Sequence, residues 1–338
     1  MKTRSFLSQA LAICSFALLL NGFALAGAGP QDKTKPKVPE AEAKAGSAIE
    51  TAPDINAKMA AAEDFVKKYP KSTLRPHVAA YIEDQILNVT DGNQKLALAQ
   101  KYSTIFTDKA EVDSIKPALI DAYVKLNRLD EAFAEGATHL AKNSDDIQTL
   151  VILVITGVEQ AKNKNPKYVD ASRQYGAKAI ELFEGDKKPA AMDAEIWTRE
   201  KTMLPQIYQE MAIISLMQQN PTEAQGRLEK AVKLNASDPF NYMLLGSIAN
   251  DDYQKTAQTY KGMPDGKVKD EMLQKINGLL DKVIDHYAHA VGLSEGKPAY
   301  QQFHDQILQD LTSYYRYRHN NSTEGLQKLI DGYKMPGT

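Results

Sequence analysis

The fold is set by residues 207–249, which contain two short breaks in an otherwise helical pattern. Their sequence is IYQEMAIISLMQQNPTEAQGRLEKAVKLNASDPFNYMLLGSIA. On both sides of QQNP, and again after NASDP, apolar residues recur every three or four positions, as on one face of a helix. The stretch therefore predicts successive helices joined by short connections.

Helical periodicity continues along the chain from Asp54 onward. The apolar-periodic segments are each 13 residues or longer and lie at about 76–89, 93–107, 110–126, 129–142, 146–163, 167–184, 190–218, 221–234, 238–250, 267–292, 297–319 and 322–334. No stretch alternates apolar and polar residues as paired strands do. The sequence predicts an all-α fold.

Small and apolar residues keep a fixed phase around the breaks. They are Met211, Ala212, Ala224, Leu228 and Ala231, then Tyr242, Leu245, Gly246 and Ala249, and, in residues 110–146, Leu119, Tyr123 and Ala132. Small residues let helix backbones approach closely, and the larger residues fill the space between hairpins.

This phase resembles the tetratricopeptide repeat (TPR), a 34-residue unit of two antiparallel helices. The resemblance implies an α-solenoid, a TPR-like superhelix of about six or seven hairpins over residues 54–338. It is strongest over 110–146 and 205–250. Insertions at 162–168, 184–193 and 250–267 interrupt the regular spacing.

Residues 1–26 have the three-part pattern of a secretory signal peptide. Lys2 and Arg4 precede the apolar run LAICSFALLL (11–20), and Ala24-Leu25-Ala26 provides small residues for cleavage after Ala26. The run is shorter than the roughly 20 residues that span a bilayer. We therefore expect a mature chain without a transmembrane segment; retention of the leader as an anchor is the alternative.

Residues 27–53 are predicted to form a disordered linker. The sequence GAGPQDKTKPKVPEAEAKAGSAIETAP is rich in Pro, Ala and Gly and has no aromatic residue. Such a segment has little apolar surface to offset the conformational entropy lost on folding.

Composition excludes several function classes. The single cysteine, Cys14, lies in the leader, so the mature chain would have neither a disulfide nor a cysteine nucleophile. The formal net charge is −2, or −4 without Lys2 and Arg4, which argues against nucleic acid as a partner.

Motifs for catalysis and cofactor binding are absent from the sequence. It has no HExxH, GxxxxGK[ST], GxSxG or GxGxxG pattern. Asp285, His286 and His289 have helical spacing for metal ligands, but no further ligand is evident, and an ordinary amphipathic helix is preferred. We expect a protein that is not an enzyme and has no cofactor or metal.

The TPR resemblance also suggests which residues line a binding groove. The first helix of each unit lines the concave surface in this family, and the matching positions are Asp121, Lys125, Gln206, Gln209, Met243, Asn250 and Asp251. Such mixed polar and apolar character suits a peptide or an exposed protein segment.

A second candidate surface is the segment SYYRYRHNN (313–321). Tyr315, Arg316 and Arg318 interleave an aromatic ring with cations and form a candidate polar patch. Tyr314 and Tyr317 share a helix face with Leu311, which favours packing against the last helix as the alternative.

Together these features predict an exported, non-catalytic scaffold or assembly adaptor of a bacterial cell envelope, periplasmic or secreted. It would bind a protein or peptide in the solenoid groove. The alternative is a periplasmic carrier or receptor for a small molecule or glycan that uses the Tyr-rich C-terminal hairpins.

Overall fold

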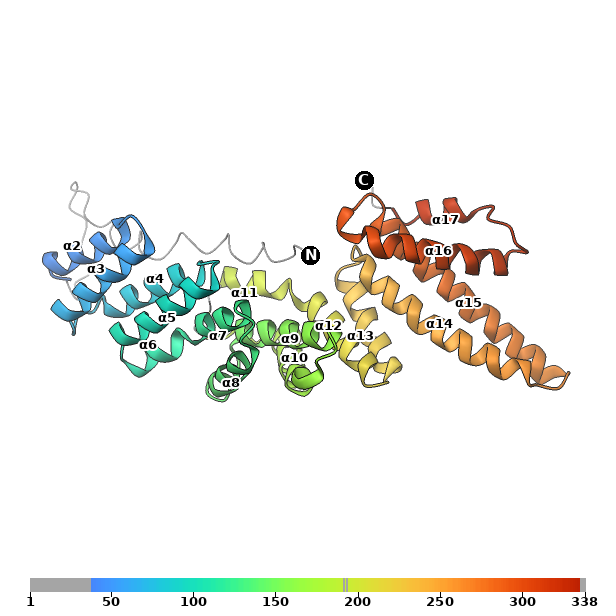
Figure 1. Cartoon of the computed structure of the whole chain (residues 1–338), viewed down its shortest axis with the longest axis horizontal. Helices are drawn as coiled ribbons and strands as arrows, with labels where there is room; N and C mark the ends of the chain where they lie inside the picture. The colour runs from blue at the N-terminus through green and yellow to red at the C-terminus, as the bar shows by residue number, and fades with distance from the viewer. Residues whose placement is uncertain (1–37, 191, 193, 335–338) are drawn as a thin grey trace, which may run out of the picture. The chain divides into compact units, whose positions relative to one another are not determined.

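The structure is a computed structural model that describes residues 38–190, 192 and 194–334. Within these ranges the regular structure is α-helix and short 3₁₀ turns, with no strand. The all-α prediction is confirmed (Figure 1). The predicted leader, residues 1–26, lies outside the described residues.

The chain divides into two compact units, Met1–Leu153 and Val154–Thr338. The single TPR-like array over residues 54–338 stays a prediction. In a repeat array each hairpin contacts mainly its neighbours, so contacts between distant parts of the chain are few and the array can be divided into smaller compact units. The boundary lies within α9 (Ile147–Lys162).

The first unit begins with neighbouring helices that pack in chain order. They are α2 (Glu40–Thr51), α3 (Ile55–Lys68), α4 (Arg75–Leu87), α5 (Gly92–Ile105), α6 (Lys109–Ser114), α7 (Lys116–Lys125) and α8 (Leu129–Leu140).

The second unit continues in the same manner, with α12 against α13, α14 against α15, and α15 against both α16 and α17. Its elements are η2 (Pro166–Tyr168), α10 (Val169–Glu184), α11 (Ala194–Lys201), α12 (Leu204–Met217), α13 (Pro221–Leu234), α14 (Pro239–Lys261), α15 (Lys267–Ser294), η3 (Pro298–Tyr300), α16 (Gln301–Arg318) and α17 (Leu326–Asp331).

Short polar side chains start several helices where the sequence predicts breaks. The carboxylate of Asp54 accepts a hydrogen bond from the Ala57 amide (2.9 Å). Asn220 and Asp238 cap α13 and α14 in the same way, and Pro follows each as the first helical residue. Capping satisfies amide groups that have no partner inside the helix, and Pro there loses no hydrogen bond.

Small residues allow the close helix packing that the sequence pattern predicts. Ala212, Ala224 and Leu228 are fully buried in one cluster with Leu245. At Gly246 on α14, an added Cβ would lie 2.4 Å from the Tyr287 ring of α15. Glycine there lets the two helices approach more closely than any side chain would allow.

The linker prediction is wrong for its second half. Residues 40–51 form α2, which packs against α3. Ile49 is only 1% exposed, and the Ser72 hydroxyl donates a hydrogen bond to Glu42. The prediction took the Ala- and Gly-rich composition to mean too little apolar surface for folding. In the structure Gly46 lies against Leu74, because small residues let the helix pack closely on its neighbours.

The predicted insertion at 250–267 is also largely helical. The helix α14 continues to Lys261, so α14 and α15 form a long pair (Figure 1). No helix in the described part of the chain is long and apolar enough to cross a membrane.

Candidate functional site

Two predicted groove residues of the first unit belong to an ion cluster. Lys95 of α5 is 2% exposed, and its ammonium donates hydrogen bonds to the Leu87 carbonyl and to the Asp121 carboxylate. The Lys125 ammonium approaches the same carboxylate at 2.7 Å. Burial lowers the pKa of Lys95, and Asp121 partly opposes that shift. Asp121 therefore compensates a buried cation, which the sequence pattern did not reveal.

The two groove candidates on α12 lie in different environments. Gln206 is exposed. Gln209 is buried, and its amide donates hydrogen bonds to Asp238 and Asn241, both at 2.8 Å. These bonds hold α12 to the start of α14, so Gln209 has a structural role.

The three candidates on α14 differ in exposure along the helix. Met243 is half-buried in the core that α14 shares with α15. Asn250 is half-buried and accepts a hydrogen bond from the Tyr314 hydroxyl of α16 (2.6 Å). Asp251 is exposed. Asp121 and Lys125 belong to the first unit, whereas Gln206, Gln209, Met243, Asn250 and Asp251 belong to the second.

The predicted polar patch at 313–321 does not form as one surface. Tyr315 is buried, its hydroxyl donates to the Glu324 carbonyl (2.8 Å), and its ring stacks on His319. Arg318 is held by Asp281 of α15, with Nε 2.7 Å from the carboxylate. Arg316 is exposed. Successive helical residues point in different directions, so an interleaved sequence does not make an interleaved surface.

Tyr314 and Tyr317 of this segment belong to a different surface, where α14 meets α16. The rings of Phe240 and Phe303 pack at 6.4 Å, and those of Tyr253 and Tyr314 pack at 6.0 Å further along both helices. The two helices therefore run in the same direction. We define the α14–α16 face by its half-buried and exposed polar and aromatic residues: Asn250, Asp251, Gln254, Asp310, Tyr314 and Tyr317.

The α14–α16 face combines an exposed ring with polar groups. Tyr317 is 71% exposed, more than any other large hydrophobic side chain in the described part of the chain. Gln254 is exposed, and its amide lies 3.4 Å from the Tyr314 hydroxyl. The buried Tyr287 of α15 lies beneath; burial raises its pKa, and the nearby Tyr314 and the carboxylates of Asp310 and Asp251 raise it further. Along the helices, Asp310 precedes Tyr314 by one turn, and Asp251 directly follows Asn250, the residue that accepts the Tyr314 hydrogen bond.

Sequence reasoning missed four members of this face. Asp310, Tyr314 and Tyr317 are spaced by four and three residues, which places them on one side of a helix. That spacing could have identified the α16 half of the face. Tyr314 packs against Tyr253 and Tyr287, and not against the last helix as the sequence suggested.

His289 of α15 belongs to an aromatic stack. The His289 ring lies 4.3 Å from that of Tyr242 and 3.4 Å from that of Tyr333, and the Tyr333 hydroxyl donates to Asp285. Burial lowers the pKa of both His286 and His289. Among the described residues, no group of three or more His, Cys, Asp or Glu is placed to hold a metal ion.

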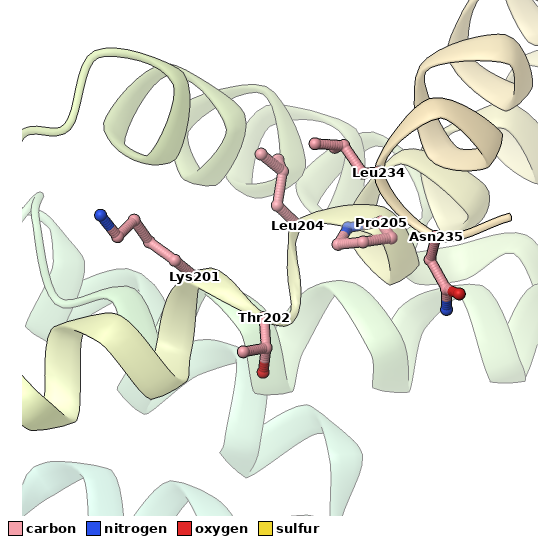
Figure 2. Close-up of a pocket in the computed structure, with 6 residues that line it drawn as sticks. All are labelled: Lys201, Thr202, Leu204, Pro205, Leu234 and Asn235. Carbon is pink, nitrogen blue, oxygen red and sulfur yellow. The ribbon is translucent and has the colours of Figure 1, made fainter. Parts of the chain in front are cut away.

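Two open surface cavities lie in the second unit. Figure 2 shows one of about 350 Å³, with Lys201, Thr202, Leu204 and Pro205 along the α11–α12 connection and Leu234 and Asn235 at the end of α13. The other, of about 500 Å³, lies between Met217 and Pro166. In the first cavity, the Lys201 ammonium is paired with Asp186 at 2.9 Å. Neither lining brings together a nucleophile and a base that could activate it.

Comparison with known proteins finds structural likeness only. The sequence matches no protein-family model and no curated protein sequence. One similar solved structure is a tetratricopeptide repeat protein from Parabacteroides merdae, with a TM-score of 0.40 and 11% identity over 80% of this chain and 98% of that one. Another is from a functional characterisation of Pseudomonas aeruginosa pilF, with a TM-score of 0.37 and 13% identity over 86% of this chain and 98% of that one. These likenesses concern the helical fold and not a function.

Proposed function

We propose that the chain is a non-catalytic scaffold or adaptor that binds a segment of another protein on the α14–α16 face. The observation that carries the proposal is Tyr317, a ring 71% exposed on a face with amide and carboxylate side chains. Exposed aromatic residues ringed by polar groups supply much of the binding energy in protein interfaces.

The proposal includes export to the bacterial cell envelope. It rests on the pattern of the first 26 residues, a positive start, an apolar run and a small-residue cleavage site. An exported adaptor would meet its partners outside the cytoplasm.

Binding to partners in an envelope extract tests the scaffold function. With the purified chain immobilised, we expect Tyr317→Ala to reduce partner recovery at least tenfold, since truncating an interface tyrosine commonly costs about 2 kcal/mol. Arg316→Ala is the matched control, because Arg316 is the exposed neighbour on another side of α16. Equal recovery with both variants would contradict the proposed site.

A carrier or receptor for a glycan is the second candidate, favoured by the same exposed ring, because a tyrosine face can stack on a sugar. A thermal-shift screen separates the two functions. A single oligosaccharide that raises the melting temperature, and fails to do so for Tyr317→Ala, would favour the carrier.

A further inference from the structure

The α14–α16 face carries two carboxylates that lack a cationic partner. Within the described residues, no ion pair involves Asp251 or Asp310, and Asp310 accepts a hydrogen bond from the neutral Gln306 amide at 3.5 Å. Lys255 lies one turn beyond Asp251 and forms no ion pair with it. Some carboxylates of this unit are paired, as Asp281 is with Arg318, whereas Asp305 accepts a hydrogen bond from the neutral Gln301 amide.

Aromatic rings lie beside these carboxylates. Tyr314 follows Asp310 by one helical turn, and Tyr317 follows by two. A cation above a tyrosine ring is attracted by the negative face of the ring, and a carboxylate at its edge adds charge attraction and a hydrogen-bond acceptor. A lysine or arginine side chain can use both groups at once.

We propose that the α14–α16 face binds a basic segment of its partner, with lysine or arginine side chains between Tyr317 and the carboxylates of Asp251 and Asp310. This inference rests on the proposed function and names the partner's chemistry. Arginine suits the site particularly, because its planar guanidinium stacks on a ring while it donates to a carboxylate.

The charge and hydrogen bonding of the face disfavour other ligands. An acidic segment would bring like charges beside Asp251 and Asp310, and like-charge contacts oppose association. A neutral sugar could hydrogen-bond to these groups, but it would bring no charge to offset those of Asp251 and Asp310. A basic polypeptide matches the uncompensated charge best.

Labelled synthetic peptides test the inference with the full chain. Three peptides of equal length share their apolar positions and carry Arg, Gln or Glu at the remaining ones. By fluorescence polarisation we expect the Arg peptide to bind most tightly and to weaken as NaCl is raised. The double variant Asp251→Asn with Asp310→Asn should bind the Arg peptide about tenfold more weakly, which is the effect of losing two modest ion pairs.

Asp252→Asn is the matched control. It removes the same charge from an exposed residue of α14 that helical geometry turns about 160° away from Asn250 and about 100° away from Asp251, and it should leave the affinity unchanged. Circular dichroism melting of each variant separates lost folding from lost binding.

The other outcomes separate the two proposals. If the Gln or Glu peptide binds as well as the Arg peptide, and Tyr317→Ala weakens it, the charge preference is wrong while the polypeptide-binding function stands. If no peptide binds and an oligosaccharide does, both the charge preference and the scaffold function are wrong. Equal weakening by Asp252→Asn would also overturn the assignment of the face.

Discussion

Asp121→Asn is expected to destabilise the first unit by about 3 kcal/mol, because it leaves a buried ammonium without its counter-charge. Lys95 is 2% exposed and donates to the Asp121 carboxylate, and Lys125 shares that carboxylate. The substitution would leave two cations close together. The loss of stability should become smaller at pH values above the lowered pKa of Lys95, because burying a neutral amine costs less free energy than burying an ammonium.

Hydrogen exchange of α5 and α7 measures this effect locally, which matters because a chain of two units need not unfold in one step. Asp145→Asn, at an exposed position, is the control and should stay within about 0.5 kcal/mol of the parent. If Asp121→Asn left exchange unchanged but abolished partner binding, Asp121 would be a binding residue and its structural role would be refuted.

Glu83→Gln is expected to stabilise the first unit at pH 8, by up to about 3 kcal/mol. Glu83 lies half-buried on α4, and burial raises its pKa to about 7. Nearby carboxylates, Asp146 and Asp84, raise it further, while a hydrogen bond with Ser114 and the neighbouring His139 lower it.

The raised pKa fixes the direction of the pH dependence. The ordinary value is 4.5, so between pH 4.5 and about 7 the folded state holds this proton more tightly than the unfolded state does. The stabilising contribution is therefore present at low pH and is lost as the pH rises to about 7. Glutamine carries no charge, so its advantage should grow across this window and stay constant above it.

Urea unfolding of parent and variant from pH 4 to 8, with exchange of α4 as the local readout, checks the prediction. Glu40→Gln, in the exposed first turn of α2, is a control that should shift stability by only a few tenths of a kcal/mol. Equal stability of the parent and Glu83→Gln at pH 8 would mean that Glu83 is solvated and ionised there without cost.

The helical fold could be predicted from sequence because helix periodicity and breaks are local signals. The breaks around Asn220 and Asp238 coincide with helix starts in the structure. The helix α2 was missed because its stability comes from packing Ile49 against other helices, which periodicity alone does not report in an Ala- and Gly-rich segment.

The candidate site was less predictable because each residue's role depends on its partners across helices. Asp121 and Gln209 match groove positions by spacing, yet one compensates Lys95 and the other bonds Asp238 and Asn241. Tyr315 was selected over Tyr317 although only Tyr317 is exposed. Choosing between neighbours on a helix requires knowing which side faces the next helix.

Site-specific photocrosslinking tests the central claim most directly. A photoreactive benzoylphenylalanine replaces Tyr317 in one version of the chain and Arg316 in another, and each version is irradiated in the cells that produce it. The account predicts a discrete crosslink to a polypeptide from position 317, mapped by mass spectrometry to a basic segment, and none from position 316. A polypeptide crosslink from position 316 with none from 317 would contradict binding on the α14–α16 face.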